Sequence, residues 1–133
     1  MATIDHLILK INDLSASVDF YVNVMGFQLE GQREPFTVIR VNEDFVLQLA
    51  PWGTSGYEHL AFSLPRKDFD NVFTRLKERG IEFGDSFHSV GNNSGPGVEF
   101  GARGEAPTVY VHDPNKHLIE IRTYDEHASA ELL

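Results

Sequence analysis

The feature that most constrains this chain is a pair of similar stretches, residues 3–11 (TIDHLILKI) and residues 57–64 (YEHLAFSL). Each stretch alternates between two kinds of side chain, which is typical of a β-strand with one face toward a core. Each also carries a His-Leu pair, at His6 and at His59, 53 positions apart. A strand that recurs in this way predicts a duplicated fold in which the two histidines occupy equivalent places.

The elements after each strand recur in the same order. After the first strand, Asn12-Asp13 predicts a helix cap, and apolar residues spaced i, i+3, i+4, i+7 predict an amphipathic helix. That stripe consists of Val18, Tyr21, Val22 and Met25, with Gly26 at the end of the helix. The second stripe, in a helix over 67–79, consists of Phe69, Val72, Phe73 and Leu76, with Gly80 at its end. Strands are predicted at 27–33, 36–42 and 45–50 in the first copy, and at 81–88, 107–112 and 117–124 in the second, with a turn at 113–116.

The second copy contains a glycine-rich segment, residues 89–105, that has no counterpart in the first. It accounts for the growing offset between matched positions, because Thr37-Val38 matches Thr108-Val109 at 71 residues while His6 matches His59 at 53. Glycine gives such a segment conformational freedom. We expect either a mobile lid or wall for a substrate, which Arg103 and Glu99 could contact, or a plain surface loop.

These patterns predict one α+β domain over residues 1–133, built from two βαβββ modules at about 1–51 and 55–124. The two modules should form a curved mixed sheet with both helices on its outer face. The acidic tail, residues 125–133, is predicted to be either a short helix or unstructured.

Composition excludes several functions. The chain has no cysteine, so disulfides, thiolate metal sites and a cysteine nucleophile are absent. Its 20 acidic and 11 basic residues give a net charge of −9, which opposes binding to nucleic acid or to anionic membranes. No apolar run approaches the roughly 20 residues that span a bilayer, and the N-terminus resembles no signal peptide. A soluble cytoplasmic protein is expected.

The two faces of the predicted strands differ in character. One face is aliphatic or aromatic throughout and should pack on the helices. The other face is mixed, with polar groups at mid-strand: His6, Ile8, Lys10, Val46, Gln48, Ala50, His59, Ala61, Ser63, Leu118, Glu120 and Arg122. A partly apolar face with a few convergent polar groups is typical of a binding site.

Four of these polar residues are candidate metal ligands, because the repeat aligns His6 with His59 and Gln48 with Glu120. Two imidazoles, one carboxylate and one amide oxygen suit a divalent ion such as Zn, Ni, Fe, Mn or Co. The remaining histidines lack this support and are expected at the surface: His88, His112, His117 and His127.

Three segments, IDHLILKINDLSASVDFYVNVMGFQ, EHLAFSL and VYVHDPNKHLIEI, resemble the vicinal oxygen chelate superfamily. Its members include glyoxalase I, fosfomycin-resistance thiol transferases, extradiol dioxygenases and bleomycin-resistance proteins. The resemblance covers nearly the whole chain. It implies an open cup formed by paired βαβββ modules, a metal ion held inside by His6, Gln48, His59 and Glu120, and a homodimer.

Departures from each subfamily leave the substrate open. RGEAPTVYVHDP (103–114) resembles a fosfomycin-enzyme stretch and makes Arg103 and Tyr110 candidate substrate-binding residues, but those enzymes have a threonine where Ile8 stands. Glyoxalase I usually has a glutamate where Gln48 stands, and an amide cannot serve as a base. Ring-cleaving dioxygenases use the His, His, Glu set but are often longer, and bleomycin binders lack the ligands.

The resemblance therefore implies a metal-dependent enzyme that chelates adjacent oxygens of a small molecule, with lyase, isomerase or thiol-transferase chemistry. Glu120 would serve as ligand and also as the base, since it is the only carboxylate of the set. The alternatives are an Fe(II) ring-cleaving dioxygenase and a metal-free protein that binds a drug or another hydrophobic ligand.

Overall fold

The computed structural model describes residues 1–125 of the 133-residue chain. These residues form two compact units, which are considered separately. The first comprises Met1–Glu58 and Asp113–Lys116, and the second comprises His59–His112 and the chain from His117 onward. Among residues 1–125, no helix has both the length and the apolar character needed to cross a membrane.

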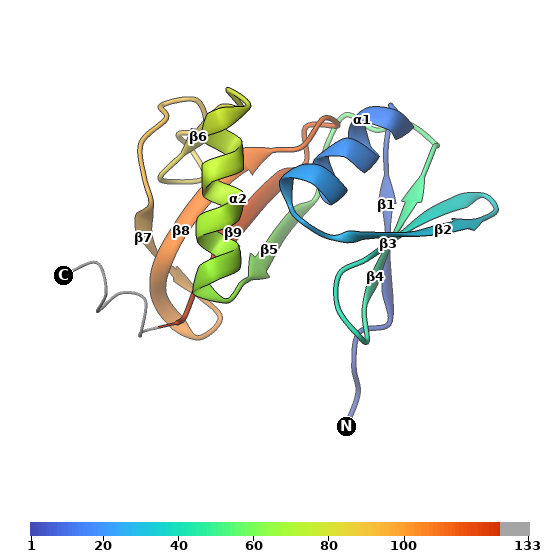
Figure 1. The fold of residues 1–133 in the computed structure, drawn as a ribbon, viewed down its shortest axis with the longest axis horizontal. Coiled ribbons are helices and arrows are strands. Elements are labelled where there is room, and N and C mark those ends of the chain that lie inside the picture. The colour runs from blue at the N-terminus through green and yellow to red at the C-terminus, as the bar shows by residue number, and fades with distance from the viewer. Residues whose placement is uncertain (126–133) are drawn as a thin grey trace. The chain divides into compact units, whose positions relative to one another are not determined.

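The first unit contains a four-stranded mixed sheet (Figure 1). Its elements are β1 (His6–Lys10), α1 (Leu14–Val18), a π-helical segment (Asp19–Val24), β2 (Gln28–Arg33), β3 (Phe36–Arg40) and β4 (Val46–Ala50). The strand order is β1-β4-β3-β2, with β1 parallel to β4 and the other neighbours antiparallel.

The second unit repeats this topology with one interruption. Its elements are β5 (His59–Ser63), α2 (Arg66–Glu78), β6 (Phe83–Gly84), β7 (Gly97–Gly101), β8 (Gly104–His112) and β9 (Leu118–Arg122). The order is β5-β9-β8-β6, and β7 also pairs with β8. Together β6 and β7 take the place that β2 has in the first sheet. The predicted α+β class and the repeated βαβββ order are confirmed.

The strand registers of the two units are identical at the candidate ligands. In the first unit His6 pairs with Val46 and Ile8 with Gln48. In the second unit His59 pairs with Leu118 and Ala61 with Glu120. In each sheet, the histidine and the polar residue therefore occupy diagonal positions on the same face of two parallel strands.

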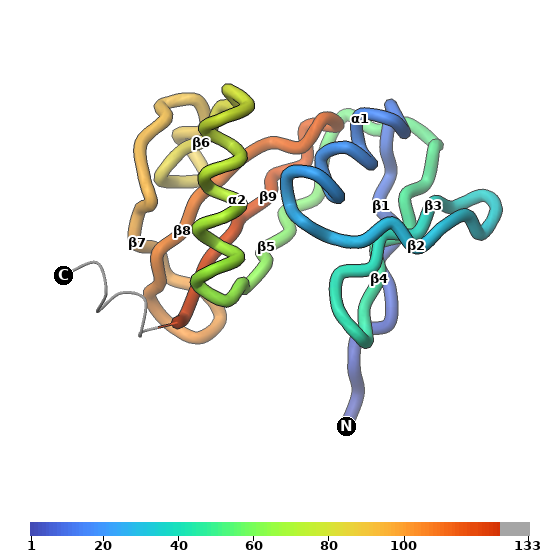
Figure 2. The backbone as a smooth tube through the Cα atoms, viewed as in Figure 1, coloured from blue at the N-terminus to red at the C-terminus, as the bar shows by residue number. Residues whose placement is uncertain are grey.

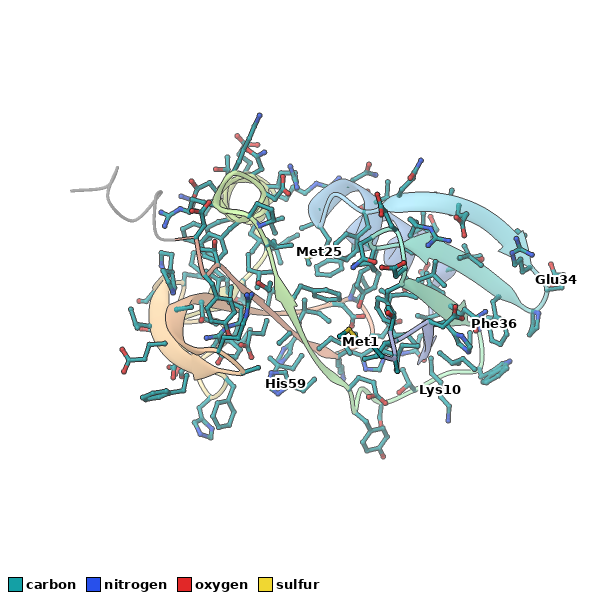
Figure 3. The ribbon with its side chains drawn as sticks, turned by 90° about the horizontal axis from the view of Figure 1, so that it is seen from below. Met1, Lys10, Met25, Glu34, Phe36 and His59 are labelled. Atoms are coloured by element: carbon teal, nitrogen blue, oxygen red, sulfur yellow. The ribbon has the colours of Figure 1, made fainter. Side chains whose placement is uncertain are left out.

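The apolar faces of both sheets are largely buried, as predicted, although Leu7, Leu60 and Phe62 are only half-buried. In the first sheet the fully buried members are Leu9, Leu47 and Leu49, and in the second they are Ile119 and Ile121. Figures 1 and 3 show α2 along one face of the second sheet. Phe69, Val72 and Leu76 of α2 are fully buried, and each such side chain contributes about 1.5–3 kcal/mol through removal from water.

The first helix differs from the predicted one. The predicted stripe included Val18 and Val22, but these are only half-buried, while Phe20 and Val24 are buried beside Tyr21 and Met25. The reason is the wider π-helical turn after α1, in which the Met25 N–H donates to the Phe20 carbonyl. This turn changes the residue spacing that faces the core.

The predicted strand over 81–88 and the predicted irregular segment 89–105 are both wrong in detail. The strand stops at Gly84, and residues 97–101 form β7 within the glycine-rich segment. Residues 85–96 fold back beside β6 (Figure 2), where Asn93 exchanges hydrogen bonds with the backbone of Phe83 through its N–H and its Oδ1. A Cβ at Gly84 would meet the backbone of Ser89, so the chain can fold back this closely only with glycine there.

The predicted turn at 113–116 is confirmed and belongs to the first unit. Tyr21 donates its hydroxyl hydrogen to Asp113 at 2.6 Å, and the backbone N–H of Asn12 donates to the Asn115 side chain at 2.8 Å. Asn115 in turn donates to Ser17 at 3.0 Å. Burial, followed by the charge of Asp113 and its hydrogen bond, raises the pKa of Tyr21 well above its usual value.

The expectation for the other histidines is right at two positions and wrong at one. His88 and His112 are exposed, but His117 is 1% exposed and lies in the core. His117 directly precedes β9, where alternation with the buried Ile119 places it on the apolar face. His127 and all but the first residue of the predicted acidic tail lie outside the described residues.

Candidate functional site

The second unit brings two of the four candidate ligands into contact. Nε2 of His59 lies 2.8 Å from Oε1 of Glu120 across the parallel strands β5 and β9. A carboxylate accepts hydrogen bonds, so this contact is a hydrogen bond when Nε2 carries the imidazole proton, and a metal ion bound to Nε2 would take the place of that proton. The His59 side chain is 50% exposed and the Glu120 side chain is 7% exposed. Figure 3 shows His59 on the side of β5 away from α2. This is the mixed face, on which the sequence pattern predicted the metal ligands.

Arg122 holds the other oxygen of Glu120. Its Nη1 donates to Oε2 at 2.6 Å, and both side chains are almost completely buried. Burying an unpaired carboxylate is costly, whereas a hydrogen-bonded guanidinium compensates its charge. The sequence pattern had placed Arg122 on the mixed face without a role. The missed signal was its spacing, because Arg122 follows Glu120 by two residues and so lies on the same face of β9.

Tyr110 and Phe87 form an aromatic border beside this pair. Tyr110 is paired with Glu120 across β8 and β9, and its ring centroid lies 6.3 Å from that of His59. The Phe87 ring, which is 54% exposed, lies 6.5 Å from that of Tyr110. Burial first, and then the negative charge of Glu120, raises the pKa of Tyr110 to about 12. Tyr110 is therefore a neutral hydrogen-bonding group at ordinary pH.

Arg103, the other predicted substrate-binding residue, lies on the tip of the β7–β8 hairpin. Its Nη2 donates to Oγ of Ser63 at 3.0 Å, on the same face as His59. Its guanidinium carbon lies 4.1 Å from the centre of the Tyr124 ring. The side chain is exposed, so it combines a fixed position with access to solvent.

The first unit holds the other two candidates. His6 shares a face with Gln48, and its Nδ1 contacts Oδ2 of Asp5 at 2.7 Å. A polar pocket of about 310 Å³ opens over this face. Its lining comprises Asp5, Glu30, Arg33, Val38, Arg40, Asp44, Val46 and Gln48. Hydrogen bonds from Arg40 lower the pKa of Glu30, so this pair is charged across the ordinary pH range.

The donor pair in the second unit fits a divalent metal ion. Transition metals bind imidazole nitrogen and carboxylate oxygen at about 2.0–2.2 Å, so two adjacent ligand atoms of one ion lie about 2.8–3.6 Å apart, depending on the coordination geometry. The 2.8 Å separation of Nε2 and Oε1 matches that requirement. Within residues 1–125, however, no group of three or more His, Asp or Glu side chains gathers at one point. Within each unit the structure places one candidate pair on a shared face: His59 with Glu120 in the second unit, and His6 with Gln48 in the first.

Comparison with known proteins agrees with the duplicated topology. A family model for the glyoxalase/bleomycin resistance protein/dioxygenase superfamily matches residues 3–121. The chain belongs to this superfamily. The chain is 28% identical over 130 residues to virulence protein STM3117 of Salmonella typhimurium, a match that covers 91% of this chain and 83% of that one.

Two further proteins that are similar to this chain have names that describe enzymes. The chain is 24% identical over 128 residues to the glutathione transferase FosA of Serratia marcescens, covering 91% of this chain and 80% of FosA. The solved structure of the oxidase ChaP-H1 superposes with a TM-score of 0.77 at 26% identity, covering 95% of this chain and 98% of that one. Superfamily membership with such relatives supports a metal-dependent function of the superfamily's type.

Proposed function

We propose that the protein is a metal-dependent enzyme that acts on a small molecule with two adjacent oxygen atoms. The observation that carries this proposal is the contact between His59 and Glu120 on the face of the second sheet away from α2. The identical register of His6 and Gln48 in the first sheet supports them as further ligands of the same ion. A divalent ion would act there as a Lewis acid that stabilises negative charge developing on substrate oxygens.

The surrounding residues have distinct parts in this proposal. Arg103 supplies a positive, solvent-accessible group for an anionic part of the substrate, and Tyr110 supplies a neutral hydrogen-bond donor beside Glu120. The carboxylate of Glu120 has one oxygen toward His59 and the other on Arg122. A role as base would therefore have to use Oε1, the same oxygen that faces the ion.

Among the reactions of the superfamily, thiol transfer to a small electrophile is proposed first, because FosA is a glutathione transferase by name. Ile8 and Gln48 differ from the residues expected for fosfomycin enzymes and for glyoxalase I, so the electrophile is proposed to differ from the substrates of both. Oxidation of an aromatic substrate is the second candidate. The border of Phe87 and Tyr110 beside His59 favours it, since aromatic side chains stack on planar rings.

A metal-free ligand-binding role and a homodimer complete the set of proposals. The exposed Phe87 of the second unit would serve a bound hydrophobic molecule without chemistry. The outer strands of both sheets, β2 and β7 among them, leave edges that a second copy of the chain could cover. Sedimentation at micromolar concentration tests the dimer, and a monomer would remove that part of the proposal alone.

The experiment that tests the main proposal starts from metal-free protein. Zn²⁺, Ni²⁺, Mn²⁺, Co²⁺ and Fe²⁺ are added one at a time, binding is measured by calorimetry, and each loaded sample is assayed for two reactions. These are thiol addition to an epoxide and oxygen consumption with a catechol. Turnover that depends on one of the ions supports the enzyme. Tight binding of an unaltered ligand by the metal-free protein, with no ion bound, would favour the ligand-binding role.

A further inference from the structure

Arg122 is fixed to three acceptors at once. Its Nη1 donates to Oε2 of Glu120 at 2.6 Å. Its Nη2 donates to the backbone carbonyls of Glu99 at 2.8 Å and of Gly104 at 3.2 Å, which belong to β7 and β8. Two of the three acceptors are backbone atoms of one hairpin. The guanidinium therefore cannot follow a movement of Glu120 unless the hairpin moves with it.

The hairpin leaves a space that the Arg122 side chain fills. A Cβ at Gly101, the last residue of β7, would meet the guanidinium of Arg122. The backbone of Gly101 is not in the left-handed region, so its conformation does not require glycine. The missing side chain instead leaves room for Arg122. The ring of Tyr124 lies 5.1 Å from the guanidinium carbon and borders it as well. Backbone, glycine and ring thus define one position for the charge.

We propose that Arg122 is a positioning residue that reserves Oε2 of Glu120 and leaves Oε1 as the single oxygen available to a metal ion. The proposal rests on the metal site described above. A carboxylate can bind an ion through one oxygen or through both. With Oε2 held by a buried guanidinium, Glu120 occupies one ligand position of the ion. A further position then stays available for a substrate with two adjacent oxygens.

Two variants of the whole chain test this role. Arg122→Met removes the charge and both sets of hydrogen bonds, and Gly101→Ala displaces the guanidinium while keeping its charge. Each has a matched control in the second unit. Arg66→Met removes another buried arginine, which is bonded to Asp70 on α2, and Phe100→Ala changes the exposed neighbour of Gly101 on β7.

The probes are Co²⁺, followed by its visible absorption, and acetohydroxamate, a small chelator with two oxygens. We expect Co²⁺ to stay bound in Arg122→Met and Gly101→Ala while the visible spectrum changes, because Glu120 can then use both oxygens. The Kd of acetohydroxamate for the Co²⁺-loaded protein should rise about tenfold, the scale on which residues that support metal ligands act. Arg66→Met should lower thermal stability and leave both the spectrum and this Kd unchanged.

The outcomes separate this inference from the proposed function. If the unmodified protein binds no Co²⁺, the proposed function fails. If it binds Co²⁺ but Arg122→Met keeps the original spectrum and acetohydroxamate Kd, the positioning role is overturned and the metal site stands. Loss of Co²⁺ from Arg122→Met also overturns the one-oxygen role. Should Arg122→Met fail to fold, Gly101→Ala decides by the same two readouts.

Discussion

The hydroxyl of Tyr21 donates to the carboxylate of Asp113 at 2.6 Å, and this bond joins the π-helical segment to the turn at 113–116 within the first unit. Both side chains are buried. A buried carboxylate that loses a hydrogen-bond donor is left with fewer partners to replace the water it lost on folding, and this lowers the stability of the folded state. The bond therefore ties the most distant part of the first unit's sequence to its core.

Tyr21→Phe should lower the free energy of unfolding by about 1–3 kcal/mol, because it removes a donor from a buried charged group. Urea unfolding followed by circular dichroism measures the loss. Tyr57→Phe is the control, since the Tyr57 side chain is 84% exposed and should give no measurable change. Equal stability of the two variants would contradict a structural role for the Tyr21–Asp113 bond.

Tyr110 should make stability depend on pH in the alkaline range. Its pKa is raised from 10.0 to about 12 in the folded protein, so between these values the folded chain keeps a proton that the unfolded chain has lost. The stabilisation is complete below pH 10, and stability falls as pH rises toward 12. Absorbance titration at 295 nm should show late transitions for Tyr110 and for Tyr21, whose pKa is also raised, and Tyr110→Phe should lose one of the two. Titration of all four tyrosines near pH 10 would contradict this environment.

Gly84→Ala should loosen residues 85–96. Its new Cβ would meet the backbone of Ser89, which cannot move aside as a side-chain end can. Overpacking of this kind costs about 1–3 kcal/mol. Limited proteolysis should then cut within 85–96 faster than in the unmodified chain, and Val98→Ala, an exposed change nearby, should not alter the pattern. Unchanged cleavage in Gly84→Ala would indicate that the segment is already loose, as a mobile lid would be.

Much of the fold was predictable because the spacing of apolar residues in a strand, and in a helix, is a local property of the sequence. Alternation over residues 3–11 and 57–64 gave the strands and their faces, and the repeat gave the correspondence of Gln48 with Glu120, which the registers confirm. The π-helical turn after Val18 was not predictable from spacing, because one extra residue per turn leaves the apolar pattern nearly helical. Strand β7 was not predicted, because the glycines at its two ends, Gly97 and Gly101, are typical of a loop.

The candidate site was predictable only in part. The face carrying His59 and Glu120 followed from alternation, but the partnership of Glu120 with Arg122 did not. Strand residues two apart share a face, yet whether they bond depends on the space between them. That space is left by Gly101 of β7. The sequence alone does not show that Gly101 faces Arg122, because this depends on the pairing of β7 with β8.

Gln48→Glu should retain the metal ion and bind it more tightly than the unmodified chain, because a carboxylate replaces a neutral amide at the equivalent of Glu120. Calorimetric titration with Co²⁺ measures the change. Gln28→Glu, an exposed change at the start of β2, is a control for added negative charge in the same sheet. A gain that is equal in both variants would mean that Gln48 does not contact the ion.

The most direct test of the metal site is elemental analysis of the purified protein after loading and dialysis, beside His59→Ala, Glu120→Gln and His6→Ala. The unmodified chain should hold one equivalent of divalent metal, and each variant should lose it while keeping its native circular dichroism spectrum. His112→Ala, an exposed histidine at the end of β8, should bind like the unmodified chain. A full equivalent of metal retained by both His59→Ala and Glu120→Gln, at unmodified folding, would contradict the site.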